Sequence, residues 1–380
     1  MKRNCRVSNL DIISYPLTRA KSGSRFAKVI IRRPCFNQMA KINGKIAENS
    51  LDWLLEPDDL GVQYLTLRDL VGTDAKELAD ASRQAHKKGQ IALILNNMQK
   101  EGYWEKPGAG YYPKYRGTVW SLILLAQLGA STEIDNRIST ACSYILNHTL
   151  TKGGQFTING QPSGTADCLQ GNLCTALLDL GFNDSRLDKA FEWMARTVTG
   201  EGIAPVTNKK APVRYYAGKC GPNFACASNN KLPCAWGAVK VMLAFSKISE
   251  ERKTPVIRKA IQAGVDFLFS TDPARADYPC GFNNKPSRNW WKFGFPVFYV
   301  TDLLQNVEVL VRLGYRNDSR LVNALSVIAE KQDAQGRWIM EYDYLGKTWV
   351  DFGLKKQPNK WVTLRALRVL KEPTNEGSLW

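Results

Sequence analysis

Histidine is almost absent from this chain of 380 residues, which contains only His86 and His148. Both lie in or near segments whose pattern predicts outer, amphipathic helices, so we expect them at the surface. Histidine is the usual base that activates a serine or cysteine nucleophile, and it is a frequent zinc ligand. The sequence therefore supports neither a Ser-His-Asp or Cys-His nucleophile nor a central zinc site.

Long apolar runs are absent as well. No segment is long and apolar enough to cross a bilayer, and the N-terminal region lacks the apolar stretch of a secretory signal. The nine cysteines are an odd number in a large chain, which indicates free thiols in a reducing compartment. We expect a cytoplasmic protein without a transmembrane segment.

Acidic residues are scarce at the start of the chain. Residues 1–35 contain nine Lys or Arg and a single Asp, in a chain whose net charge is +17. An Arg- and Ser-rich extension over residues 1–38 is typical of an organelle targeting segment, and a disordered or untranslated stretch ahead of a true start at Met39 is an equal alternative. A basic terminal run is usually solvated, so it predicts no specific nucleic-acid partner.

An apolar helical pattern recurs six times in the remaining sequence. The clearest copy is Gly117–Gly129, which is apolar on most sides and closes with Leu-Gly, a typical helix stop. The copies end 52 to 67 residues apart, and this slowly varying period predicts a helical repeat array. The other copies are 61–72, 171–181, 237–245, 303–314 and 361–370.

Each copy is followed by a short polar link and then by a more amphipathic helix, as in 187–194. Six such hairpins form either an open solenoid or a closed ring. An open solenoid needs polar capping repeats, whereas the sixth copy ends in apolar Leu370. We therefore predict an all-α (α/α)6 toroid, in which six apolar inner helices are wrapped by amphipathic outer ones. Residues 39–380 would be one domain, and 46–55 would supply the missing outer partner of the first copy.

Two short motifs mark the ends of predicted outer helices. Gln332–Trp338 reads Gln-Asp-Ala-Gln-Gly-Arg-Trp, and Gln99–Trp104 is a similar motif one residue shorter. On these motifs, residues 45–371 resemble the repeat superfamily of squalene and terpenoid cyclases and protein prenyltransferases, whose QW motif is Gln-x-x-x-Gly-x-Trp. The resemblance implies the same toroid. The cofactor stays unknown, and no recognised motif requires one, because the Asp-Asp-x-x-Asp magnesium motif and an Asp, Cys and His zinc set are absent. The Asp-x-Asp-Asp acid of the cyclases is absent as well.

Long loops return the chain from each outer helix to the next inner helix, so all of them fall on one rim of the ring. The N-termini of the inner helices open at this rim, which favours anions there. The loops are rich in aromatic and basic residues, which suit a small isoprenoid ligand with an apolar tail and an anionic head. Aromatic faces also stabilise carbocations. The predicted ligand-binding residues are Tyr112, Lys114, Tyr115, Arg116, Trp120, Trp236, Arg288, Trp290, Trp291, Lys292 and Phe295, with Lys114, Arg116, Arg288 and Lys292 for a diphosphate.

Carboxylates near this rim are the candidates for an acid. We predict Asp302 or Asp351 as the catalytic acid, or the two together as a pair for glycoside hydrolysis. Asp302 and Asp167 also fit helix capping, unless one of them is a buried acid whose pKa is raised among aromatic rings. Loop cysteines are weak metal candidates, because their spacing is not that of a zinc finger. They are Cys220, Cys226, Cys234 and Cys280.

The leading interpretation is a terpenoid cyclase or prenyltransferase-like protein with a central aromatic pocket for an isoprenoid. Two alternatives stay open: a non-catalytic toroid that binds a ligand or a protein, and a carbohydrate-active (α/α)6 enzyme. Because the family's catalytic signatures are missing, the sequence does not decide whether the protein is an enzyme, and it does not indicate an oligomeric state.

Overall fold

The computed structural model describes residues 49–371, except 206–213, 216–217 and 283–284. The predicted extension over 1–38 lies outside these residues. The described part is helical apart from short bridges and one parallel pair, β1 (Ala204–Pro205) with β2 (Arg214–Tyr215). Within it, no helix combines the length and the apolar character needed to cross a bilayer.

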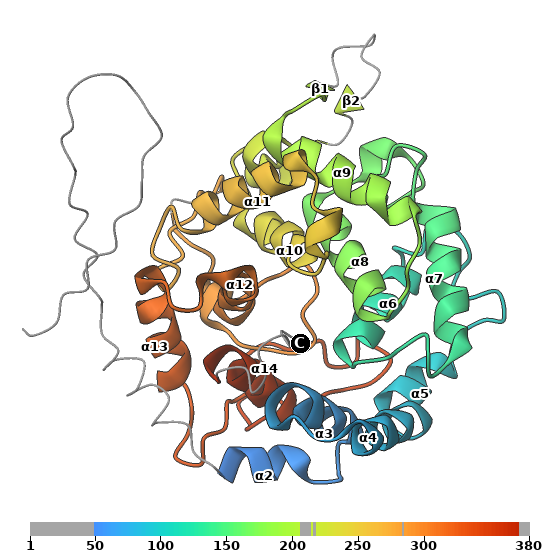
Figure 1. The fold of residues 1–380 in the computed structure, drawn as a ribbon, viewed down its shortest axis with the longest axis vertical. Coiled ribbons are helices and arrows are strands. Elements are labelled where there is room, and N and C mark those ends of the chain that lie inside the picture. The colour runs from blue at the N-terminus through green and yellow to red at the C-terminus, as the bar shows by residue number, and fades with distance from the viewer. Residues whose placement is uncertain (1–48, 206–213, 216–217, 283–284, 372–380) are drawn as a thin grey trace, which may run out of the picture.

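Inner helices surround a central axis, as Figure 1 shows. In α6 every residue from Thr118 to Leu125 is buried, which is typical of a helix enclosed on all sides. The inner helices are α3 (Leu60–Thr66, continued by η1, Leu67–Val71), α6 (Thr118–Gln127), α8 (Asp167–Asp179), α10 (Ala235–Phe245), α12 (Leu303–Leu310, continued by η7, Val311–Tyr315) and α14 (Lys360–Leu370).

Amphipathic helices form the outer layer. They begin at side-chain caps such as Asp74, which accepts hydrogen bonds from the backbone N–H groups of Lys76 and Glu77 at 2.9 and 3.0 Å. The outer helices are α2 (Asn49–Leu55), α4 (Ala75–Lys87), α5 (Gln90–Leu95), α7 (Asn136–Thr149), α9 (Arg186–Thr199), α11 (Pro255–Leu268) and α13 (Val322–Glu330). Short 3-10 turns are η2 (Pro162–Gly164), η3 (Pro222–Phe224), η4 (Ala227–Asn229), η5 (Glu250–Arg252), η6 (Arg288–Trp291) and η8 (Ser319–Leu321).

Each of the two tryptophan motifs joins one outer helix to the inner helix that follows it. The indole of buried Trp338 donates to the carbonyl of Ile328 in α13 at 2.8 Å, and its backbone N–H donates to Thr363 of α14 at 2.9 Å. Trp104 repeats both contacts, with the carbonyl of Ile94 at 2.8 Å and a threonine of α6 at 3.1 Å. The motif is therefore a structural connection, which explains why it predicts the fold and not the activity.

Close packing between inner helices depends on glycine. A Cβ atom on Gly171 of α8 would lie 2.3 Å from the carbonyl carbon of Lys240 in α10, so no side chain fits there. Pairs of inner helices can approach this closely only where a residue has no side chain. This contact holds α8 against α10, and their first turns bring two walls of the candidate site together.

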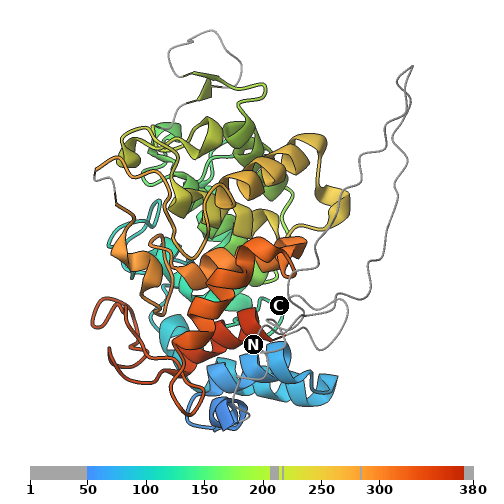
Figure 2. The same cartoon turned by 90° about the vertical axis from the view of Figure 1, so that its left-hand side faces the viewer.

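The ring closes where the last inner helix meets the first. Lys360 at the start of α14 binds Glu56 at 2.9 Å and also contacts Asp58, while the indole of Trp361 donates to Asp59 at 2.8 Å. Helix α2 packs against both α3 and α14, as predicted for 46–55, and Figure 2 shows the first and last helices side by side. The all-α (α/α)6 toroid predicted from the repeats is confirmed.

Candidate functional site

An apolar cavity of about 430 Å³ opens among the long loops and the N-terminal turns of α6, α8 and α10. Its volume lies in the range of about 300–1,000 Å³ that is common for small-molecule pockets. Aromatic rings form much of its wall, because the loops supply tyrosines and the helix starts supply tryptophans. The aromatic lining residues are Tyr111, Trp120, Trp236, Tyr278, Phe282, Trp290 and Tyr299.

Asp167, the first residue of α8, lines this cavity and is only 3 % exposed. Neither carboxylate oxygen has a hydrogen bond of normal geometry, although the thiol of Cys220 lies close enough to lower the pKa somewhat. Burial dominates and raises the pKa of Asp167 to about 8. The group is therefore mainly a neutral carboxylic acid near pH 7, with a proton to donate.

The space around Asp167 is set by a second glycine. A Cβ atom on Gly237 of α10 would lie 3.0 Å from the Cβ of Asp167, so this position keeps the side chain of the acid free of a close neighbour. The backbone on the other side is fixed by a parallel bridge between Ala166 and Lys219. The acid is thus held by the scaffold of α8, α10 and the loop before η3, and not by partners of its own.

Two lysines are among the polar residues of the lining. The ammonium of Lys114 is 3.3 Å from the hydroxyl of Tyr299 and lies over the rings of Tyr299 and Tyr111, at 5.3 and 5.9 Å from their centroids. Lys219 is exposed and lines the same cavity. Both could contact the head group of a ligand whose tail lies against the rings.

Four of the predicted ligand-binding residues line the cavity, namely Lys114, Trp120, Trp236 and Trp290. The others lie around it. Tyr115 packs among the rings of Trp120, Phe298 and Tyr344, and Arg116 lies over the ring of Trp349 at 5.5 Å. Phe295 stacks on Trp361 at 4.5 Å, and the indole of Trp291 donates to the carbonyl of Ala274. Tyr112 is 63 % exposed, and Arg288 and Lys292 are exposed without lining the cavity.

Neither predicted acid lies in the aromatic cavity. Asp302 caps α12 by accepting from the N–H of Gln305 at 3.0 Å, and both its oxygens bind the guanidinium of Arg365 at 2.8 Å. Asp351 is exposed and accepts from the N–H of Gly346 at 2.9 Å. Both carboxylates therefore have structural partners, and the geometry moves the candidate acid to Asp167.

Several other residues of the cavity wall are not among those predicted from the sequence. Tyr111, Tyr278, Tyr299 and Lys219 lie in the segments that lead into inner helices, as the selected residues do, and no sequence pattern singled them out. For Asp167 a signal existed, because it lies four residues before the apolar copy 171–181. Aromatic density within the loops would have been the better guide to the wall.

Four cysteines also line the cavity, and a fifth, Cys220, lies beside Asp167. They are Cys168, Cys226, Cys234 and Cys280. In the part of the chain that the structure describes, no group of three or more His, Cys, Asp or Glu side chains has the geometry to hold a metal ion. The arrangement is one of neighbouring thiols that form no disulfide.

The opposite end of the inner barrel has a different character. A cavity of about 290 Å³ lies among the C-terminal turns of the inner helices, and it is lined by Arg68, Lys247, Arg312, Arg365 and Arg368 together with Asp179 and Glu308. Cations are favoured there because helix C-termini carry a negative partial charge. Buried Asp69, for example, binds Arg68 and Arg368, which together hold its pKa below the usual range although burial alone would raise it.

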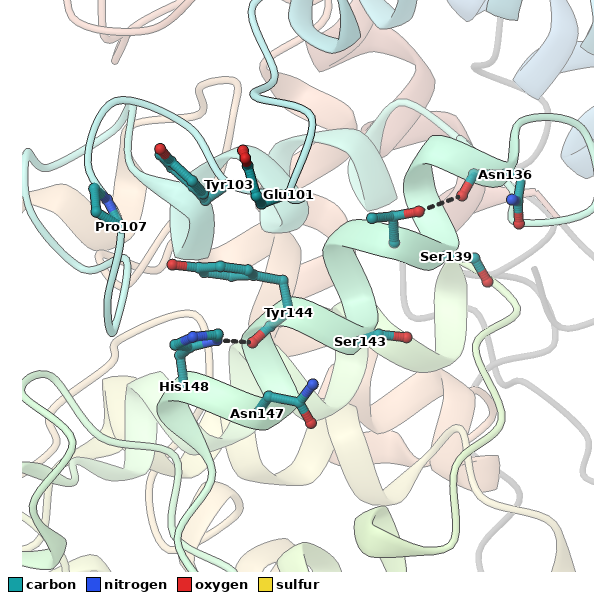
Figure 3. Close-up of a pocket in the computed structure, with 10 residues that line it drawn as sticks. Glu101, Tyr103, Pro107, Asn136, Ser139, Ser143, Tyr144, Asn147 and His148 are labelled. Atoms are coloured by element: carbon teal, nitrogen blue, oxygen red, sulfur yellow. Dashed lines mark hydrogen bonds between the residues drawn. The ribbon is translucent and has the colours of Figure 1, made fainter.

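A polar groove also runs along the outer face of α7, beside the loop over residues 101–107 (Figure 3). The ring of Tyr144 stacks on His148 at 3.9 Å between centroids and contacts Tyr103 at 5.4 Å. Its hydroxyl accepts from the N–H of Gly108 at 2.7 Å. These rings contact one another and leave little aromatic surface for a ligand. The groove is also more open than the central cavity, so it would enclose less of a ligand.

Comparison with known proteins gives only distant likenesses. No protein-family model matches the sequence, and no curated protein matches it. A variant of the type II terpene cyclase MstE from Scytonema is 13% identical with a TM-score of 0.44, covering 88% of this chain and 98% of that one.

Another MstE structure, in complex with geranylgeranyl dihydroxybenzoate, is 12% identical with a TM-score of 0.32 and covers 77% and 96% of the two chains. A family 10 polysaccharide lyase from Cellvibrio cellulosa is 14% identical with a TM-score of 0.29 and covers 60% and 80%. At these identities and TM-scores, none of the activities in those names transfers to this chain.

Proposed function

We propose that the central cavity binds an apolar, unsaturated ligand of the isoprenoid class and that Asp167 protonates it to start a cyclisation. The observation that carries this proposal is a buried carboxyl without a hydrogen-bond partner in a cavity walled by aromatic rings. An ionised carboxylate in such a place is costly, so the group keeps its proton until a substrate accepts it.

The reaction needs only groups that line the cavity. The O–H bond of Asp167 breaks as the proton forms a C–H bond with a terminal alkene carbon, and a second alkene of the ligand then attacks the resulting carbocation. Aromatic faces such as the indoles of Trp120 and Trp290 stabilise that cation by roughly 0.5–2 kcal/mol each when water is excluded. Loss of a proton from the cyclised cation ends the sequence. Since the proton is regained, the net reaction is an isomerisation without a cofactor.

The two lysines fit the other part of such a ligand. Lys114 and Lys219 line the cavity, where the ammonium groups would attract a phosphate, diphosphate or carboxylate head. Asp167 is the only carboxyl among the described lining residues, and an anionic head would therefore meet more cations than anions. This charge balance supports a ligand that is apolar at one end and anionic at the other.

The same count weakens the carbohydrate-active alternative. Glycoside hydrolysis by the common mechanisms uses two facing carboxyl groups, whereas Asp167 has no second carboxyl among the described residues of this cavity. The non-catalytic alternative uses the same cavity and differs in turnover alone. Binding without reaction is therefore the outcome that would distinguish it.

The proposal is tested by incubating the protein with farnesyl and geranylgeranyl diphosphate in D₂O and analysing dephosphorylated products by gas chromatography–mass spectrometry. We expect cyclised products with deuterium at the carbon that was protonated. Asp167→Asn should lower turnover by roughly 10²–10⁴-fold while ligand affinity is kept, since only the proton donor is lost.

Asp302→Ala is the comparison variant, because it removes a carboxyl with an equally buried position but no place in the cavity; its turnover is compared per folded molecule. Cyclisation that continues unchanged in Asp167→Asn would reject Asp167 as the acid. Binding without any product would support the scaffold alternative. Absence of binding to either diphosphate and to the free alcohols would reject the isoprenoid pocket.

A further inference from the structure

A small hairpin forms the part of the cavity wall that carries two of its thiols. Ala225 and Pro233 pair in an antiparallel bridge, flanked by hydrogen bonds from Cys226 N–H to the Leu232 carbonyl at 3.2 Å and from Cys234 N–H to the Phe224 carbonyl at 2.9 Å. Cys226 lies one residue from the bridge on its turn side, and Cys234 lies one residue from it on the other side. The two cysteines are therefore diagonal neighbours on the same face of the hairpin. Both line the cavity.

Donors converge on the sulfur of Cys226. The thiol of Cys234 is placed to donate to it, as are the backbone N–H and the hydroxyl of Ser228. The N–H of Asn229 lies close as well, and it donates to the carbonyl of Cys226 at 2.8 Å. These donors outweigh the effect of burial and lower the pKa of Cys226, while the pKa of Cys234 rises because it supplies the shared proton. The pair therefore loses its first proton more readily than an ordinary thiol does, and the resulting charge lies on Cys226.

The turn that supplies the amides is rigidly fixed. The side-chain amide of Asn229 donates to the carbonyls of Pro233 and Pro279 at 2.8 and 3.0 Å, and its oxygen accepts from the N–H of Gly281 at 3.0 Å. Asn229 therefore connects the hairpin to the loop that carries Cys280. The donors to Cys226 are held in place before any reaction begins.

We propose that Cys226 is a nucleophilic thiolate that reacts with hydrogen peroxide and small hydroperoxides, and that Cys234 converts the product into a Cys226–Cys234 disulfide. This proposal stands on the hairpin geometry and does not depend on which ligand the cavity binds.

The chemistry balances with peroxide as the oxidant. The thiolate of Cys226 attacks one peroxide oxygen, the O–O bond breaks, and the departing hydroxide takes up a proton to become water, leaving a sulfenic acid. The sulfur of Cys234 then attacks the sulfenic sulfur, the S–O bond breaks and a second water leaves. Two thiols lose two electrons in total, and one peroxide is reduced to two waters.

Three of the other described cysteines are poorer nucleophiles. Burial raises the pKa of Cys142 to about 12, and it raises the pKa of Cys168, which lines the same cavity, to about 11. Cys174 is fully buried within α8. Because the thiolate is the reactive form, oxidation should begin at Cys226 and not at these positions.

Oxidation would also affect the neighbouring acid, a consequence that rests on the proposed function. The negative charge of Cys226 contributes to the raised pKa of Asp167, after burial as the main cause. A disulfide carries no charge, so forming it would make Asp167 release its proton more readily. The cavity would then hold its acid less well in the oxidised protein.

The experiment treats the whole protein with one equivalent of hydrogen peroxide, blocks the remaining thiols with N-ethylmaleimide and maps peptides without reduction. We expect a linked pair of peptides containing Cys226 and Cys234, and an intact mass lower by two hydrogen atoms. In Cys234→Ser the reaction should stop at the sulfenic acid, which dimedone traps at Cys226. In Cys226→Ser both signals should vanish.

Cys168→Ser is the matched control, because it removes a cavity thiol outside the hairpin and should leave the linked peptides unchanged. Faster oxidation of Cys168 or Cys280 than of Cys226 would overturn the proposal, as would a Cys226 that remains reduced while a free cysteine peptide in the same tube is oxidised. If a variant fails to fold, the order of iodoacetamide labelling in the unaltered protein decides, with Cys226 expected first among the described thiols.

Discussion

The two ends of the inner barrel use ionisable groups in opposite ways. At the end formed by helix C-termini, buried charges are paired, as in the contacts of Asp69 with Arg68 at 2.6 Å and with Arg368 at 2.7 Å. At the aromatic end, Asp167 is buried without a partner. The paired charges at the C-terminal end maintain the fold. An unpaired buried acid destabilises the fold and needs another explanation. This contrast is the main reason for placing function at the aromatic end.

The largest expected effect comes from breaking a buried pair in which one partner, Arg365, lines the charged cavity. Arg365→Met leaves Asp302 buried without its cation, and we expect the free energy of unfolding to fall by about 3–5 kcal/mol. Arg83→Met is the control, because Arg83 and Asp80 form a pair in which both side chains are about half exposed. Urea denaturation measures both. A loss below about 1 kcal/mol in Arg365→Met would remove the difference between the two ends.

An effect of comparable size and opposite sign is expected at the aromatic end. Burial raises the pKa of Asp167 from 3.8 to about 8, so the unfolded chain releases this proton at lower pH than the folded one. The stability contributed by the protonated group is complete below the lower value and is lost as pH rises through the higher one. Asp167→Asn should therefore gain stability relative to the unaltered protein, by on the order of 5 kcal/mol between about pH 4 and pH 8.

Denaturation of Asp167→Asn and of the unaltered protein across that pH range checks this expectation. If the free energies of unfolding of the two proteins change with pH in the same way, folding does not raise the pKa of Asp167. The contrast between the two ends would then fail.

The space beside the acid gives the next effect. Gly237→Ala places a Cβ atom 3.0 Å from that of Asp167, and the needed adjustment should cost about 1–2 kcal/mol and weaken ligand binding. In Gly218→Ala the nearest atom would be 3.7 Å away, at the Cβ of Ala227, which is an ordinary contact. Thermal unfolding and titration of a prenyl ligand compare the two variants. Equal behaviour would show that the cavity adjusts freely around the acid.

The smallest effect is expected near the charged end, at the link after α6. The Nε2 atom of His86 accepts from the N–H of Ser131 at 3.0 Å, and Nδ1 contacts the carbonyl of Ser82 at 2.7 Å. Burial lowers the pKa of His86 below 6.5, so its contribution is present above that pH and is lost as pH falls.

We expect the unaltered protein to lose up to about 1 kcal/mol between pH 7.5 and 5.5, and His86→Asn to lose less. His148→Asn, at an exposed outer position, should behave as the unaltered protein does. An identical pH response of all three would show that this link does not titrate.

The sequence allows the ring to be predicted because burial on all sides leaves a strong periodic pattern, as in Thr118–Leu125. Part of the cavity wall could also be predicted from the sequence, since Trp120 and Trp236 lie at the starts of apolar copies. Asp167 and Asp302 could not be told apart in this way, because both precede inner helices. The difference lies in Arg365, which is 63 residues from Asp302 and meets it only in the folded ring.

The contact that closes the ring has a consequence for folding. The bond between Trp361 and Asp59 joins residues that are 302 positions apart, whereas the tryptophan motifs join neighbours along the chain. Contacts between neighbours form at low entropic cost, and a closure over this distance forms late. An open array frays from its ends, but a ring has no free end once α14 is seated. Stability of the whole molecule should thus depend cooperatively on this single seam.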